Sequence, residues 1–208
     1  MRTETLRVDH VRPDGAALAR AARALGRGEL VAFPTETFYG LGARALDASA
    51  VRRVFAAKGR PESKPLLVLV DSPAMAERVA LVATAARRLM DAHWPGALTL
   101  VLPARDAVPV EVTAGTGTIG VRMSSHPVAT GLVAALGDPV TAPSANLAGG
   151  APPTTAADVL RDLDGRIDLL LDGGPTPGGL PSTILDATVD PPRVLREGPV
   201  RVAGAAAP

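Results

Sequence analysis

Two periodicities of apolar residues alternate along the chain and predict an α/β protein. Apolar positions recur at helical spacing over several segments, which predicts helices over 13–27, 47–57, 73–80, 83–92, 127–136 and 154–163. Short runs that are continuously apolar, or apolar at every second position, predict strands over 29–34, 66–70, 97–103, 118–123, 139–142, 167–172, 182–187 and 193–197. The run LLVLV at 66–70 is typical of a strand that is buried on both faces.

The ends of the predicted helices carry residues that favour helix starts and stops. Asp14 precedes the first helix and Gly28 follows it. Asp47 is suited to cap the second helix, and Gly59 is suited to end it. These residues support the helical interpretation independently of the apolar pattern.

The order of the elements predicts one domain over residues 1–208. No internal repeat and no long linker interrupts the pattern, so we place the core at about 10–200 and expect a disordered tail at 201–208. Some strands follow one another without an intervening helix, which indicates a mixed rather than a parallel sheet. We therefore expect a twisted mixed β-sheet of about seven strands flanked by helices.

Composition excludes several classes of protein. Apolar residues make up 47% of the chain and charged residues 21%, the balance of a globular domain. The absence of cysteine excludes disulfides, thiolate metal sites and cysteine nucleophiles. A formal net charge of +1 provides no global basic field for nucleic acid or a membrane surface. No secretion signal or long apolar run is present, so we expect a cytoplasmic protein with no membrane partner.

Several well-known site motifs are missing. The sequence has no Walker A motif and no G-x-S-x-G nucleophile elbow, and its three histidines do not show metal-ligand spacing. The segment GTGTIG at 115–120 matches G-x-G-x-x-G, but it leads into a strand rather than a helix. We interpret it as a turn and expect no dinucleotide or metal site.

The segment FPTETFYGLG at 33–42 follows a predicted strand and is the first candidate site. It contains the only tyrosine of the chain and two of its three phenylalanines. The two phenylalanines are expected in the core. Thr35 and Thr37 alternate in direction with them and are the better ligand candidates.

The segment KGRPESKPL at 58–66 is a candidate anion site. Arginine is the usual cation of this chain, and the 22 basic residues include two lysines, Lys58 and Lys64. Prolines in the segment predict an extended chain or a loop rather than a helix, and in an extended chain Lys58, Arg60 and Lys64 share one face. A bend would bring the three cations onto a polyphosphate; the alternative is an exposed basic loop.

Two further segments place polar side chains at alternate positions. On the predicted strand TIGVR, Thr118, Gly120 and Arg122 share one face, which could hold a carboxylate against the guanidinium. In TAPSAN at 141–146, Ser144 and Asn146 follow a strand, where α/β proteins bind ligands. Both residues are also common in ordinary turns.

Six motifs in this order resemble the YrdC/TsaC-like threonylcarbamoyl-AMP synthase family. They are PTETFYGLG, the K-x-R of KGRPESKPL, TIGVRM, PSAN, STILD at 182–186 and R-E-G at 196–198, and they span about 29–198. The resemblance implies a YrdC-like fold with a positively charged cavity. It also implies the synthesis of threonylcarbamoyl-AMP and pyrophosphate from L-threonine, bicarbonate and ATP, with Mg²⁺. The product would pass to a separate transferase complex that forms threonylcarbamoyladenosine in tRNA.

The resemblance also implies roles for individual residues. Lys58 and Arg60 match the K-x-R pair and are expected to act in catalysis by neutralising the ATP phosphates. The positions expected to bind ATP are Lys58, Arg60, Lys64, Thr118, Ser144, Asn146, Pro152 and Arg196. The positions expected to bind threonine are Thr35, Arg122, Ala142 and Ser182, with Arg122 on the carboxylate.

The sequence departs from the family pattern at two positions. Ala148 and Pro152 stand where the family usually has serines, so a nucleotide contact at Pro152 would use its backbone carbonyl. The sequence ends about ten residues after R-E-G, which resembles the short form of the family.

Two other functions compete with the synthase. The fold could handle another carbamoyl-adenylate, in which case threonine would not be required. The cavity could instead bind tRNA or another RNA weakly, but the net charge of +1 and the 2% aromatic content are unlike those of single-strand binding platforms.

Overall fold

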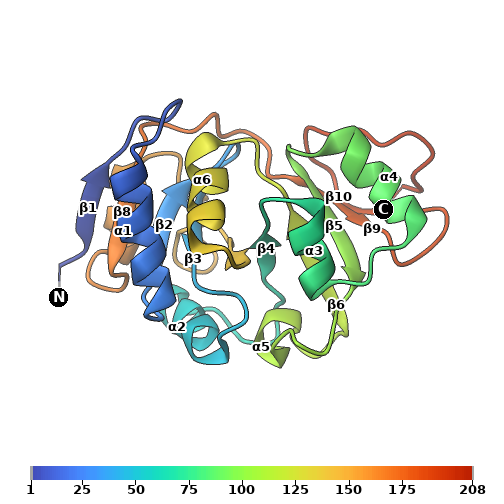
Figure 1. Ribbon diagram of the computed structural model, residues 1–208, viewed down its shortest axis with the longest axis horizontal. Helices are drawn as coiled ribbons and strands as arrows, with labels where there is room; N and C mark the ends of the chain where they lie inside the picture. Colours follow the sequence, from blue (N-terminus) through green and yellow to red (C-terminus); the bar gives the residue numbers. More distant parts are fainter. Residues whose placement is uncertain (1, 208) are drawn as a thin grey trace.

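The computed structural model describes residues 2–207, and these residues form ten strands in two mixed sheets together with seven helices (Figure 1). The predicted α/β class and the mixed character of the sheet are confirmed. The prediction of one sheet with about seven strands is wrong, because the strands divide between the two sheets.

The smaller sheet contains four strands, in the order β1 (Glu4–Arg7), β8 (Leu169–Asp172), β2 (Val31–Pro34) and β3 (Tyr39–Gly42). Strand β8 runs parallel to both of its neighbours, and β3 pairs antiparallel with β2. Strands β2 and β3 are buried throughout. The pairing of Pro34 with Tyr39 makes residues 35–38 the turn of a hairpin.

The larger sheet contains six strands, in the order β10 (Arg193–Arg196), β9 (Thr183–Asp186), β5 (Leu98–Pro103), β6 (Thr118–Arg122), β4 (Leu67–Leu69) and β7 (Val140–Thr141). The pairs β5–β9 and β4–β6 are parallel, and the other neighbouring pairs are antiparallel. Its central strands are largely buried.

The helices cover both sheets, and six of them lie close to the predicted ranges. They are α1 (Gly15–Gly26), α2 (Ala48–Lys58), α3 (Pro73–Val79), α4 (Thr84–His93), α5 (Val110–Thr113), α6 (Pro127–Leu136) and α7 (Ala156–Leu163). Helices α1 and α6 pack side by side against the four-stranded sheet (Figure 1). The predicted caps are confirmed: Asp14 and Asp47 accept hydrogen bonds from the first turns of α1 and α2, and Gly59 ends α2 in the left-handed conformation.

The two sheets meet along β3 and the segment that follows β7. The backbone nitrogen of Leu41 donates to the carbonyl of Pro143 at 2.7 Å, and that of Ala145 donates to the carbonyl of Tyr39 at 2.8 Å. A side chain at Gly42 would come within 2.8 Å of Phe33 and 2.9 Å of Val140, so the contact requires glycine there. This seam brings the PTETFYGLG and TAPSAN segments together.

Three elements lie outside the sequence prediction, and each has a short or interrupted pattern. Strand β1 is mostly exposed, β3 contains two glycines, and α5 is four residues long. The predicted turn at 115–120 is confirmed, because Gly115 and Gly117 have positive φ angles and lead into β6.

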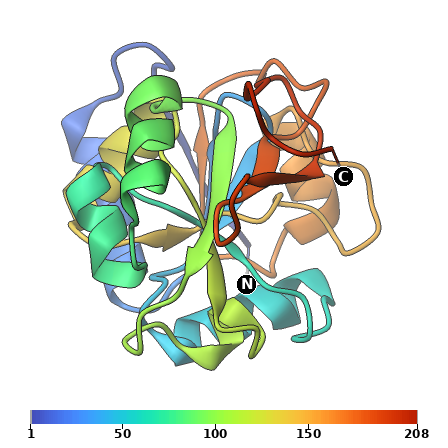
Figure 2. The ribbon, with the colours of Figure 1, turned by 90° about the vertical axis from the view of Figure 1, so that its right-hand side faces the viewer.

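The C-terminal segment differs from the expected disordered tail. Ala206 pairs with Arg193, and its nitrogen donates to the carbonyl of Pro192 at 2.8 Å, beside β10 (Figure 2). Pro208 lies outside the described residues. No helix among residues 2–207 is both long enough and apolar enough to cross a membrane.

Candidate active site

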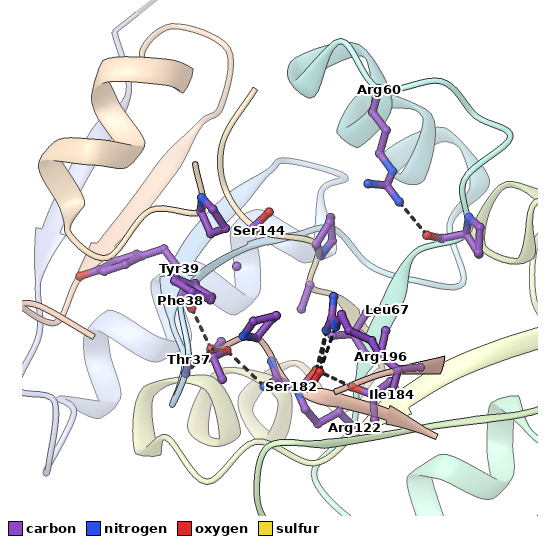
Figure 3. Close-up of a pocket in the computed structure, with 18 residues that line it drawn as sticks. Thr37, Phe38, Tyr39, Arg60, Leu67, Arg122, Ser144, Ser182, Ile184 and Arg196 are labelled. Atoms are coloured by element: carbon purple, nitrogen blue, oxygen red, sulfur yellow. Dashed lines mark hydrogen bonds between the residues drawn. The ribbon is translucent and has the colours of Figure 1, made fainter. Parts of the chain in front are cut away.

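A cavity of about 320 Å³ opens where the β2–β3 turn meets the six-stranded sheet (Figure 3). We call it the arginine cavity. It is lined by Thr35, Thr37, Phe38, Tyr39, Gly40, Arg60, Pro65, Leu67, Thr99, Arg122, Ala142, Pro143, Ser144, Pro152, Pro181, Ser182, Ile184 and Arg196.

The charge of this lining is entirely positive. Arg60, Arg122 and Arg196 contribute three guanidinium groups, and the lining residues include no carboxylate side chain. Burial lowers the pKa of all three arginines, and the charge of Arg122 lowers the pKa of Arg196 further. A lowered pKa means that the surroundings disfavour the cationic form, so an anion in the cavity would stabilise it.

The cavity brings together eight of the predicted site residues from distant parts of the chain. They are Thr35, Arg60, Arg122, Ala142, Ser144, Pro152, Ser182 and Arg196. Lys58, Lys64, Thr118 and Asn146 do not line it. The structure therefore separates the predicted set into a lining group and a surrounding group.

Arg122 reaches the cavity because of the pleat of β6. Ile119 and Val121 point into the core, and Arg122 lies on the opposite face, as predicted. Its side chain is only 3% exposed and forms an ion pair with Glu36. Thr118 lies on the same face of β6 as Arg122 but at the other end of the strand. There its hydroxyl lies within hydrogen-bond distance, 3.0 Å, of the hydroxyl of Thr116.

The β2–β3 turn presents its two threonines to the cavity. The hydroxyl of Thr35 donates to the carbonyl of Phe38 at 2.7 Å, and the hydroxyls of Thr35 and Thr37 lie 3.1 Å apart. Arg122 Nη1 lies 3.5 Å from the hydroxyl of Thr37. The turn and β6 thus form one polar wall.

Beside Arg122, on the neighbouring strands of the six-stranded sheet, lies a cluster of Ser182, Arg196 and Thr99 (Figure 3). Arg196 Nη2 donates to the carbonyl of Ser182 at 2.8 Å and to its hydroxyl at 3.1 Å, and that hydroxyl lies 2.9 Å from the hydroxyl of Thr99. Gly198 makes the arrangement possible, since a Cβ there would lie 2.3 Å from the backbone nitrogen of Thr183. The R-E-G and STILD motifs are therefore parts of one wall.

The prediction that residues 58–66 contain no helix is wrong at the start of the segment. Lys58 is the last residue of α2, and residues 61–64 form a turn. A proline restricts the residue immediately before it, so Pro61 does not prevent helix at Lys58. As a result, Lys58, Arg60 and Lys64 do not share one face: Arg60 lines the cavity, whereas Lys64 is exposed.

Lys58 is buried behind the TAPSAN loop. Its Nζ donates to the carbonyl of Asn146 at 2.6 Å and also to the carbonyl of Ser144. Burial, together with the charge of Arg60, lowers the pKa of Lys58 to about 8. Lys58 therefore holds the backbone of the loop that carries Ser144 into the cavity.

Asn146 and Ala148 complete this loop. Asn146 Nδ2 donates to the carbonyls of Leu147 at 2.8 Å and Gly150 at 2.9 Å, while its Oδ1 is buried and has no partner in the described part of the chain. The nitrogen of Ala148 donates to the carbonyl of Lys58 at 2.8 Å. The residue at 148 contributes here through its backbone, which alanine supplies as well as serine.

The sequence interpretation missed Glu36, Ser124 and Thr99. Glu36 accepts hydrogen bonds from Arg122 and from the hydroxyl of Ser124. The sequence contains one indication of a role for Glu36, namely its position between the two candidate ligand residues Thr35 and Thr37. Its partners are 86 and 88 residues away, and no local pattern indicates such a pairing.

The described residues contain no group of three or more histidine, cysteine, aspartate or glutamate side chains that could hold a metal ion. The lining of the arginine cavity has guanidinium, hydroxyl and carbonyl groups but no carboxylate. It is therefore suited to anions, and it does not fit a protein-held Mg²⁺ ion.

The chain is similar to known proteins over most of its length. The family model Sua5_yciO_yrdC, described as "Telomere recombination", matches residues 23–198. The chain is 48% identical over 183 residues to the threonylcarbamoyl-AMP synthase of Bacillus subtilis, covering 87% of this chain and 53% of the relative.

Solved structures agree with these matches. The crystal structure of P. abyssi Sua5 complexed with L-threonine superimposes with a TM-score of 0.94 at 40% identity, covering 99% of this chain and 62% of that one. The crystal structure of E. coli YciO gives a TM-score of 0.88 at 26% identity, covering 97% and 98% of the two chains. The chain spans about half the length of the curated relatives from B. subtilis and P. abyssi.

Proposed function

Because the chain belongs to the Sua5/YciO/YrdC family, we propose that it is an L-threonylcarbamoyladenylate synthase acting on L-threonine, bicarbonate and ATP. The observation that carries the proposal is the arginine cavity, with three guanidinium groups and no carboxylate in its lining. The substrates carry a carboxylate, a bicarbonate and a triphosphate, so all three bring negative charge to the site.

The roles that the family resemblance implies suggest where the substrates bind among the lining residues. L-threonine would lie on Arg122, with Thr35, Ala142 and Ser182 around it. ATP would lie toward Arg60, Ser144, Pro152 and Arg196. Lys64, Thr118 and Asn146 lie outside the lining, so their contacts with ATP would depend on the parts of the nucleotide that extend beyond the cavity.

The reaction needs positioning and charge neutralisation more than an enzyme nucleophile. The threonine nitrogen forms a bond to the bicarbonate carbon with loss of water, and a carboxylate oxygen so formed replaces pyrophosphate on the α-phosphorus of ATP. Negative charge develops on the leaving pyrophosphate, where Arg60 and Arg196 would stabilise it. Arg122 would orient threonine for the attack. We place Mg²⁺ with the nucleotide as part of the substrate, because the cavity offers it no carboxylate ligand.

The proposed product is an activated carbamoyl donor and needs an acceptor. We propose that a separate tRNA threonylcarbamoyl transferase complex is the downstream partner and that both act in the cytoplasm. The support is the name of the relatives and the chemistry of the product. Direct RNA binding by the cavity is the competing function.

The test is pyrophosphate release from ATP by the purified protein, with threonine and bicarbonate each added and omitted. We expect release only when both are present. Release that needs bicarbonate but not threonine would indicate another carbamoyl-adenylate. RNA binding that falls steeply with salt and does not compete with ATP would favour the RNA-binding function.

The position of Lys58 predicts opposite pH dependences for ATP binding and for folding. Its pKa of about 8 means that its positive charge disappears as the pH rises through about 8, so we expect ATP affinity to fall. In the unfolded protein the side chain of Lys58 has its ordinary pKa of 10.5. Above pH 8 this side chain therefore binds more protons in the unfolded protein than in the folded protein. The free energy of unfolding attributable to Lys58 should therefore rise over the same range.

Calorimetric ATP binding and denaturant unfolding, both at about pH 7 and about pH 9.5, check this prediction. The variant Lys58→Met cannot titrate and should lose both pH dependences. An ATP affinity of wild-type magnitude in Lys58→Met, with wild-type pH dependence, would show that the contact of Lys58 with the loop carrying Ser144 does not support ATP binding.

The close packing at Gly198 predicts a large effect for a single methyl group. In Gly198→Ala the Cβ would lie 2.4 Å from the carbonyl oxygen of Pro181 and 2.7 Å from the carbonyl carbon of Ser182. These are backbone atoms, so Ser182 and Arg196 must move apart. We expect threonine affinity to fall about tenfold, the loss of one hydrogen bond to a charged group.

The matched control is Gly15→Ala, because no atom lies within 4 Å of a Cβ at that position. Isothermal calorimetry with L-threonine should distinguish the two variants. Equal threonine affinity in both would show that the wall tolerates displacement and that Ser182 does not contact the ligand.

A further inference from the structure

The pairing of Arg122 leaves one edge of its guanidinium free. Both hydrogen bonds that the structure shows for this group leave from Nη1, to Glu36 and to Thr37. Its Nε is buried and has no partner among the described residues. A buried N–H group without a partner is costly, which indicates that a ligand satisfies it. The edge formed by Nε and Nη2 has the spacing for a two-pronged contact with a carboxylate.

Glu36 is held by two donors rather than by Arg122 alone. Its Oε1 accepts from Arg122, and its Oε2 accepts from the hydroxyl of Ser124. Arg122 and Ser124 are two residues apart, and both are buried. The carboxylate therefore spans the end of β6, and its orientation is determined on both sides.

The turn that carries Glu36 connects this contact to the rest of the cavity. Thr35 and Thr37 line the arginine cavity, whereas Glu36 between them lines a second hollow beside His10 and His126. Glu36 therefore contacts Arg122 from the side that faces away from the arginine cavity. It connects the turn to the end of β6 without occupying the space for the ligand.

We propose that Glu36 is a positioning residue, which binds Nη1 of Arg122 so that the Nε–Nη2 edge faces the carboxylate of L-threonine. This inference rests on the proposed function for the identity of the ligand. The role is geometric, because a negative charge beside Arg122 would by itself weaken the attraction for a second carboxylate. Positioning and simple charge therefore predict effects of opposite sign when Glu36 is changed.

Direct calorimetric binding of L-threonine tests the proposal without requiring turnover. We expect affinity to fall about tenfold or more in Glu36→Ala, in line with the loss of a charge-assisted hydrogen bond. Glu36→Asp keeps the charge but is too short to span Arg122 and Ser124, and it should also lose affinity. Glu36→Gln keeps the shape without the charge and should lose less, about threefold. Threonine binding of wild-type strength or tighter in Glu36→Gln and Glu36→Asp would overturn the proposal.

L-Threoninamide, which lacks the carboxylate, provides the readout that a general structural defect would not reproduce. Wild-type protein should bind it weakly, and Glu36→Ala should weaken that binding no further. ATP affinity should be unchanged in every Glu36 variant. An equal additional loss for threonine and threoninamide would show that Glu36 does not act through the carboxylate contact.

Two controls keep the outcomes distinct. Glu77→Ala removes an exposed ion pair with Arg87 and should leave threonine binding unchanged. If Glu36→Ala fails to fold, Glu36→Gln and Ser124→Ala decide the question, since each leaves a neutral or paired group beside Arg122. Failure of the wild-type protein to bind L-threonine would contradict the proposed function, whereas wild-type binding that all Glu36 variants retain would contradict only this inference.

Discussion

Replacing Arg122 by alanine is expected to weaken L-threonine binding at least about 100-fold and to leave ATP binding within about twofold of the wild type. The guanidinium would form two charge-assisted hydrogen bonds to the substrate carboxylate, and each is worth about 1.5–3 kcal/mol. The Nε that has no partner in the structure is one of the two donors. Calorimetry with each substrate separately measures both affinities.

Arg122→Ala also removes the partner of a largely buried carboxylate. Glu36 is 15% exposed, and breaking a buried ion pair costs about 3–5 kcal/mol of folding free energy. Unfolding by denaturant must therefore accompany the binding measurement. Arg122→Lys retains a cation for Glu36 but lacks the second edge, so it should fold and still lose most threonine affinity.

The two variants together distinguish shape from charge. If Arg122→Lys bound threonine as tightly as the wild type, a point charge would be sufficient and the two-pronged contact would be refuted. If both variants lost affinity for ATP and for threonine to the same extent, Arg122 would maintain the structure of the whole cavity rather than bind the threonine carboxylate specifically.

The strand containing Arg122 shows what periodicity can predict. Alternation along TIGVR predicted correctly that Ile119 and Val121 are buried in the core and that Arg122 lies on the other face. It could not show that Thr118 falls outside the cavity. Four residues of strand extend about 13 Å, more than the width of a small ligand site, so residues on one face need not share one pocket.

The segment containing Lys58 shows where a local rule was extended too far. Proline disfavours the interior of a helix at its own position and disfavours helix at the residue immediately before it, yet the prediction applied this restriction as far back as Lys58. Helix α2, capped by Asp47 and Gly59, continues to Lys58. That difference moves the Lys58 ammonium from the cavity to the carbonyls of Ser144 and Asn146.

Long-range pairing explains the remaining omissions. Strand β3 pairs with β2 across a tight turn, and its two glycines reduce the apolar signal of the strand. Glu36 meets Arg122 only because the β2–β3 turn rests on the six-stranded sheet. Such contacts depend on how the two sheets are arranged, and a prediction of one sheet contains no information about that arrangement.

The second large effect is expected at Arg60, where alanine should weaken ATP binding about 10- to 100-fold without destabilising the fold. The guanidinium donates to the carbonyl of Pro65 at 3.0 Å. Within residues 2–207 its buried Nε has no partner and the group forms no ion pair. Burial lowers its pKa. A partly buried cation with no counter-charge disfavours folding slightly and is retained where an anionic ligand needs it.

Arg60→Ala therefore distinguishes the contribution of Arg60 to ATP binding from its contribution to the stability of the fold. We expect a midpoint of denaturant unfolding at least as high as that of the wild type, together with reduced ATP affinity, unchanged threonine affinity and a shallower dependence of ATP binding on salt. Arg88→Ala is the matched control, because Arg88 is exposed and does not line the cavity. ATP affinity that stayed at the wild-type level would take Arg60 out of the phosphate site, and a large loss of stability would mean that its contact with Pro65 is structural. If instead ATP affinity falls while the midpoint of unfolding is unchanged or higher, the role of the Arg60 cation is to bind the phosphates of the ligand.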